Sequence, residues 1–149
     1  MIAATSTEMN VTRERSSERA REPAWQAYRL LHWGFVAAPV IAGLDKFFNL
    51  LVHWDKYLAP SILNLSPLGA TGSMYVVGGV EIVAGLVVAL RPRIGAWVVA
   101  AWLAGIIVDL LLVGGYYDVA LRDFGLCIAA VALARLSVTY DRPEARRAA

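Results

Sequence analysis

The sequence is poor in the residues that carry redox and metal chemistry. It holds one cysteine, Cys127, and two histidines, His32 and His53, among 149 residues. A single cysteine excludes an internal disulfide and a Cys-x-x-Cys redox pair. The two histidines lie about six helical turns apart on one segment, so they cannot bind one metal ion together. We therefore expect no metal site in this chain.

Charge is also scarce. Charged residues make up 17% of the chain, and the formal net charge is only +2. The basic residues do not form one patch, which argues against a nucleic-acid partner. Hydrophobic residues reach 58% and the mean hydropathy is +0.55, above the usual share for a soluble protein. The composition therefore indicates an integral membrane protein, whose first partner is the lipid bilayer.

Long apolar runs divide the chain into three regions. We predict a polar arm at 1–26, disordered or lying on the membrane surface, a transmembrane domain at 27–137 and a cytoplasmic tail at 138–149. Each apolar run has roughly the 17–25 residues that a membrane-spanning helix needs. The four runs are 28–52, 73–90, 94–113 and 119–136. The expected fold class is all-α, a transmembrane four-helix bundle.

The distribution of Lys and Arg predicts the orientation of this bundle, because cytoplasmic loops carry the excess of basic residues. Eleven of the 14 Lys and Arg residues fall in the N-terminal arm and its junction, in the turn around Pro92, or near the C-terminus. Only Lys46, Lys56 and Arg122 fall on the other side. We therefore expect both termini in the cytoplasm, with several membrane crossings between them.

The connection at 53–72 combines many apolar side chains with Pro60 and Pro67. It is too apolar for a free loop, and we predict a short helix or cap on the outer surface of the bundle. Small residues also recur on the predicted helices, which allows close packing between membrane helices. One such face, Ala96, Ala100 and Ala104, is a candidate contact with a second copy, although packing within the bundle is the simpler use.

Six ionisable residues lie inside the predicted helices, all in the outer half of the membrane. A charge near the bilayer centre costs about 2.5–3.5 kcal/mol even on a lenient insertion scale. We therefore expect these side chains to meet, with Lys46 and Arg122 pairing with two of the acids. The predicted polar cluster consists of Asp45, Lys46, Glu81, Asp109, Arg122 and Asp123.

Two interpretations of this polar cluster remain open. The charges either hold four helices together as structural ion pairs, or they line a binding or proton-handling cavity that opens to the outer face. Aromatic side chains near the cluster could provide walls for a flat ring. These are Phe47, Phe48, Trp54 and Phe124.

The sequence resembles the DoxX-like family of small four-helix membrane proteins. The resemblance covers about 29–136 and is carried by short motifs of glycine and charge on apolar helices. These motifs are Gly43-Leu44-Asp45-Lys46-Phe47-Phe48, Glu81-Ile82-Val83-Ala84-Gly85-Leu86, Arg91-Pro92-Arg93-Ile94-Gly95 and Leu121-Arg122-Asp123-Phe124-Gly125-Leu126. The resemblance implies a bacterial plasma-membrane protein associated with terminal oxidases, thiosulfate:quinone oxidoreductase or responses to thiol and oxidative stress.

Three function classes follow from the residues and from this resemblance. The first, which the resemblance implies, is an accessory or quinone-interacting subunit of a membrane redox system. Its quinone would lie near the polar cluster, its partner would be an oxidoreductase or a second copy, and it would have no independent catalytic activity. The second is a scaffold or assembly protein with a sealed, charge-paired core and no ligand. The third, a proton-coupled transporter of small solutes, is disfavoured because four helices without an inverted repeat do not match the usual transporter architecture.

Overall fold

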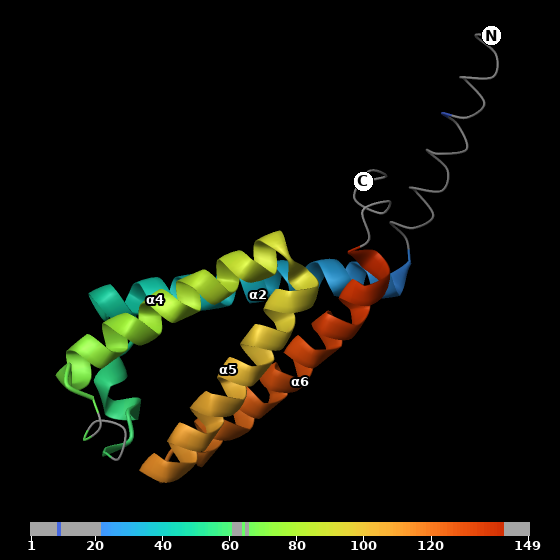
Figure 1. Ribbon diagram of the computed structural model, residues 1–149. Helices are drawn as coiled ribbons and strands as arrows, with labels where there is room; N and C mark the ends of the chain where they lie inside the picture. The colour runs from blue at the N-terminus through green and yellow to red at the C-terminus, as the bar shows by residue number, and fades with distance from the viewer. Residues whose placement is uncertain (1–8, 10–21, 61–63, 65, 142–149) are drawn as a thin grey trace.

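Four long helices make up most of the described chain. The computed structural model describes residues 9, 22–60, 64 and 66–141, and within them it contains no strand. The predicted N-terminal arm lies almost wholly outside these residues, and the predicted C-terminal tail does so from residue 142 onward. The elements are α2 (Pro23–Phe48), the short 3₁₀ helix η1 (Trp54–Tyr57), α4 (Gly69–Leu90), α5 (Pro92–Val113) and α6 (Tyr117–Tyr140) (Figure 1).

Local backbone chemistry explains where these helices begin and end. Pro92 occupies the first turn of α5, where its missing N–H costs nothing, and it prevents α4 from continuing past Leu90. Helix α5 ends at Val113 because Gly114 and Gly115 adopt positive φ angles of 72° and 84°. Helix α2 is continuous through Pro39 and ends at Asn49, which adopts the left-handed conformation with φ of 50°.

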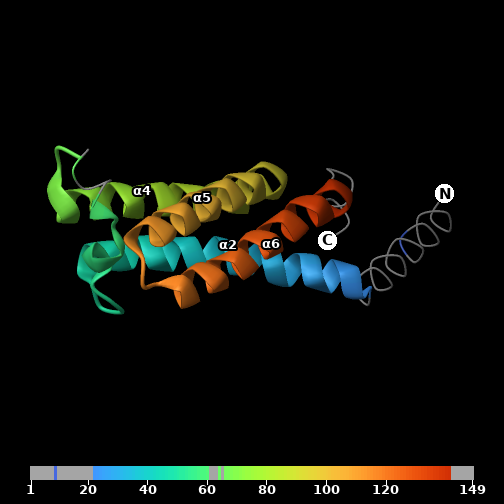
Figure 2. The same cartoon turned by 90° about the horizontal axis from the view of Figure 1, so that it is seen from below.

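The four helices form two pairs that meet at an angle. Helix α2 packs mainly against α4, and α5 packs mainly against α6, whereas contacts between the pairs are fewer. In Figure 1 the pairs come together near the turn at Arg91 and diverge away from it, and Figure 2 shows the same arrangement from below. We call the end at Arg91 the turn end, and the opposite end, where residues 49–68 connect α2 to α4, the loop end.

The hydrophobic core lies where all four helices meet. Val88 and Leu133 are its largest fully buried aliphatic side chains, and both have exposed fractions of zero. Leu110 is also fully buried but lies at the loop end. Tyr28 and Phe35 of α2 complete this core together with small residues of the other helices. Toward the loop end, polar contacts take over as the links between helices, and these contacts position the site described below.

Three of the helices are long and apolar enough to cross a membrane: α2, α4 and α5. The fourth predicted span is present as the 24-residue helix α6, which is long enough to cross a membrane but is not among the three helices that are also apolar enough. Asp118, Arg122, Asp123 and Arg135 lie along it, and each lowers its hydropathy. The structure thus supports a helical membrane protein with several crossings.

Candidate functional site

The centre of the site is an ion pair between α2 and α4. Lys46 Nζ lies 2.6 Å from Glu81 Oε2, and the two side chains are only 4% and 9% exposed. Lys46 Nζ also lies 3.7 Å from the centroid of the Trp54 ring, which adds a cation–π contact. Removing two charges from water is expensive, and only such close contacts offset this cost. The pair is therefore sealed inside the helix interface.

Glycines bring these two charges together. A Cβ atom added to Gly78 would lie 2.7 Å from the carbonyl oxygen of Gly43, and one added to Gly43 would lie 2.6 Å from that of Gly78. One added to Gly85 would lie 2.7 Å from Val40 and 2.9 Å from the carbonyl oxygen of Val36. The backbones of α2 and α4 thus touch where side chains would separate them. This close approach lets Lys46 reach one turn along α4 to Glu81.

Asp45 fixes the chain that leaves α2. Its Oδ1 accepts hydrogen bonds from the backbone N–H groups of Leu50 and Leu51 at 2.9 and 3.0 Å. Its Oδ2 accepts one from the indole N–H of Trp54 at 2.7 Å. These three donors satisfy a carboxylate that is only 6% exposed. Asp45 therefore acts by holding Trp54 against Lys46.

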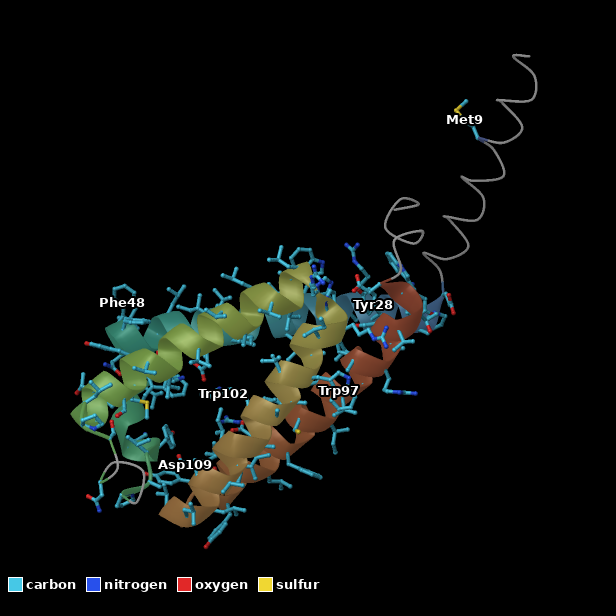
Figure 3. All side chains as sticks on the ribbon, in the orientation of Figure 1. Met9, Tyr28, Phe48, Trp97, Trp102 and Asp109 are labelled. Carbon is cyan, nitrogen blue, oxygen red and sulfur yellow. The ribbon has the colours of Figure 1, made fainter. Side chains whose placement is uncertain are left out.

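Asp109 of α5 anchors the same connection from the other helix pair. Its Oδ1 accepts a hydrogen bond of 3.0 Å from the backbone N–H of Ala59, a residue with no exposed surface. Nearby, the rings of Tyr57 and Tyr116 meet edge to face with centroids 4.9 Å apart. Figure 3 shows Asp109 close to this connection. The loop predicted to cap the bundle thus contains η1 and links the two helix pairs at the loop end.

The remaining predicted cluster members lie farther from the pair. Asp123 is partly buried, and it interacts electrostatically with Arg122 first and also with Lys46 and Glu81. Arg122 is exposed and forms no ion pair within 4.0 Å in the described part of the chain, although its charge acts on the neighbouring Asp123. The structure thus brings Asp45, Lys46 and Glu81 together and links Asp109 to them through the connection between α2 and α4. Arg122 stays outside this group.

The predicted aromatic walls are mostly absent from this site. Phe47, Phe48 and Phe124 are 41%, 67% and 54% exposed on the surface of the helices. The Phe47 ring stacks on Tyr75, with centroids 5.1 Å apart. Of the four aromatic residues named from the sequence, Trp54 alone contacts the ion pair.

The aromatic residue that does approach Glu81 is Trp102, in the middle of α5. Its indole nitrogen is buried, and the N–H acts on the Glu81 carboxylate as a hydrogen-bond donor, although the contact falls outside strict hydrogen-bond geometry. Figure 3 shows Trp102 between α4 and α5. Sequence reasoning missed it, but a signal existed: a tryptophan halfway along an apolar helix is far from the membrane interface that this residue prefers.

Trp102 also lines a crevice between α4 and α5. The crevice has a volume of about 780 Å³, and its walls are almost entirely apolar. Ala84 and Val87 of α4 and Val98 and Ala101 of α5 contribute to these walls. The volume falls within the range of roughly 300–1,000 Å³ that is typical of small-molecule sites. Glu81 itself lies behind the wall, beside Trp102.

The small-residue face of α5 is used within the chain. Ala96 and Ala100 are buried in the core with Ala130 and Ala134 of α6, whereas Ala104 is exposed. Cys127 Sγ, partly buried, donates to the carbonyl oxygen of Ala100 at 3.4 Å. This face therefore serves mainly to pack α5 against α6, as the simpler of the two interpretations expected.

No other chemistry-bearing cluster stands out in the described residues. Within them, no three His, Cys, Asp or Glu side chains are placed to hold a metal ion. His32 lies toward the turn end, where its Nε2 is 3.1 Å from the carbonyl oxygen of Val88 and its ring stacks on Tyr28.

Comparisons of the chain with protein-family models, with curated proteins and with solved structures gave no match.

Proposed function

We propose that the chain crosses the plasma membrane of a bacterium four times, with both termini in the cytoplasm. Three apolar helices and the Lys and Arg distribution support this arrangement. Helix α6 would be the fourth span, because it packs along α5 and its exposed Arg122 lies near its end, where a long side chain can reach the lipid headgroups.

Reporter fusions test this topology. Green fluorescent protein fused after residue 149 should fluoresce, and alkaline phosphatase fused at the same place should be inactive. An active phosphatase there would contradict four crossings with cytoplasmic ends. Insertion of the phosphatase at Pro67, which is exposed in the connection between α2 and α4, should give the opposite result.

We infer that this DoxX-like protein is an accessory, quinone-interacting subunit of a membrane redox system. The observation that carries this proposal is the apolar crevice beside Trp102, which is large enough for a substituted ring and opens between two helices predicted to face lipid. A quinone ring would enter this crevice rather than the ion pair, because Lys46 and Glu81 are sealed against each other. The Lys46–Glu81 ion pair would then lie behind the wall of the crevice and support it.

Filling the crevice tests this proposal. The full chain is purified in a mild detergent with its lipids, and bound quinone is quantified after solvent extraction. Ala101→Trp places a large ring in the crevice and should remove most of the bound quinone. Ala104→Trp is the matched control, because Ala104 is also exposed on α5 but does not line the crevice. Equal quinone in both variants would contradict the proposed site.

The alternative function is a scaffold without a ligand, in which the paired charges only order the helices. The burial of the Lys46–Glu81 pair favours it, because a carboxylate and an ammonium in such close contact form a complete structural unit. The same purification separates the two functions. A scaffold would carry its oxidoreductase partner, or a second copy, but no quinone even in the unmodified protein.

A further inference from the structure

The turn between α4 and α5 carries positive charge in an otherwise uncharged stretch. Between Glu81 and Asp109 the chain has two charged residues, Arg91 and Arg93, and both side chains are exposed. In the described part of the chain neither of them takes part in an ion pair within 4.0 Å. Two positive charges thus lie together at the turn end, where α4 is joined to α5 (Figure 1).

Trp97 indicates the depth of this turn in the proposed membrane. Its side chain is 51% exposed, and it follows Arg93 by four residues, so the two side chains share one face of α5. Tryptophan is enriched at the level of the lipid head groups. The two guanidinium groups would therefore lie within reach of lipid phosphates.

The apolar crevice begins close to these arginines. Its wall on α4 runs from Val76 to Val87, and Val87 precedes Arg91 by about one helical turn. Val98 lines it on α5 and follows Ile94, an exposed residue of the first turn, by four positions. At 1.5 Å per residue the wall on α4 is about 16 Å long, close to half of the roughly 30 Å thickness of a hydrocarbon core. The crevice therefore matches an acyl chain of one leaflet in length.

The crevice and the turn together fit an amphiphile with an acidic head group. The walls of the crevice present almost no polar surface, so hydrocarbon is the chemistry that gains from contact with them. Arginine binds phosphate oxygens through two parallel N–H groups. A hydrocarbon chain attached to a phosphate satisfies both features, whereas an uncharged ring satisfies the crevice alone.

We propose that α4 and α5 bind one anionic phospholipid, with its phosphate at Arg91 and Arg93 and one acyl chain in the crevice. Basic pockets between membrane helices on the cytoplasmic side bind such head groups. This inference rests on the proposed membrane crossing and goes beyond the proposed quinone site. The acyl chain and a quinone ring would use the same crevice, so each excludes the other.

Native mass spectrometry of the full chain measures this binding. The protein, purified in detergent, is titrated with phosphatidylglycerol and with phosphatidylcholine that carries identical acyl chains. Each arginine contributes roughly fivefold to the affinity for an anionic lipid, so phosphatidylglycerol should bind about 25-fold more tightly. Equal binding of the two lipids by the unmodified chain would overturn the proposal.

Two sets of variants locate the head group and the chain. Arg91→Gln and Arg93→Gln should each lower the preference for phosphatidylglycerol about fivefold. Arg135→Gln is the matched control, because Arg135 is exposed on α6 and its replacement removes the same charge. Ala101→Trp should weaken binding of both lipids about tenfold, because several methylene groups lose the crevice, whereas Ala104→Trp should not. An equal loss of preference in Arg135→Gln, or unchanged binding in Ala101→Trp, would overturn the proposed site.

The proposed quinone site is tested separately on the same chain. The double variant Arg91→Gln/Arg93→Gln should lose its preference for phosphatidylglycerol but keep its extractable quinone, because the ring carries no charge. A chain that prefers phosphatidylglycerol but carries no quinone would contradict the proposed function and support this inference.

Discussion

The two helix pairs are held together by different kinds of contact. Helices α5 and α6 meet through buried alanines and one weak hydrogen bond, from Cys127 to Ala100. Helices α2 and α4 meet through glycines, which bring the backbones closer and enclose the Lys46–Glu81 pair. Small residues alone are enough to join apolar helices. The comparison therefore shows that α2 and α4 combine close backbone contact with a buried ion pair, whereas α5 and α6 pack without one.

The largest difference between the pairs should appear when one charge is removed. Glu81→Leu leaves Lys46 buried without a partner, and we expect the free energy of unfolding to fall by about 3–5 kcal/mol. Unfolding by sodium dodecyl sulfate in mixed micelles, followed by circular dichroism, measures this change. A loss below about 1 kcal/mol would show that Lys46 reaches water easily, contrary to its exposed fraction of 4%.

A smaller effect is expected from the glycine contact. In Gly78→Ala the new methyl group meets the backbone of Gly43, which cannot move aside without separating the helices. Such overpacking typically costs about 1–3 kcal/mol. Gly79→Ala is the matched control, because nothing lies within 4 Å of its added Cβ. Equal stability of the two variants in the same assay would remove the argument for backbone contact between α2 and α4.

The link between the two pairs can be weakened separately. Asp109→Ala removes the acceptor for the buried N–H of Ala59, and we expect a loss of about 1–2 kcal/mol. Faster hydrogen exchange at the Ala59 amide would locate the change in the loop. Asp109→Asn keeps an acceptor oxygen and should retain slower exchange; identical exchange in the two variants would contradict this role.

The smallest effect is expected in the α5–α6 pair. Cys127→Ala removes a weak thiol hydrogen bond but keeps a small apolar side chain, so the free energy of unfolding should change by less than about 1 kcal/mol. The micelle assay used for Glu81→Leu allows a direct comparison. A loss as large as that of Glu81→Leu would mean that α5 and α6 also depend on a polar contact.

The sequence was informative where physical patterns are local. Apolar runs located all four helices, and Pro92 located the turn between α4 and α5. Helix ends were less well predicted: α2 ends four residues before the predicted Val52, because Asp45 draws Leu50 and Leu51 into a turn. Those two hydrogen bonds depend on the geometry of the Asp45 side chain, which the periodicity of a helix does not predict.

The polar cluster was predicted only in part, for geometric reasons. Arg122 and Asp123 are neighbours, and successive residues on a helix point about 100° apart, so both cannot face the same partner. The structure directs Asp123 inward and leaves Arg122 exposed. Trp102 was overlooked although its position halfway along α5 was a signal, because its proximity to Glu81 depends on the angle between α4 and α5.

The central claim is that Lys46 and Glu81 form one buried unit, and a double-mutant cycle tests it most directly. Unfolding free energies are measured for Lys46→Met, for Glu81→Leu and for the double variant. Because each single change leaves a buried charge and the double change leaves none, the double variant should be at least about 2 kcal/mol more stable than either single variant. Losses that simply add in the double variant would contradict a direct ion pair.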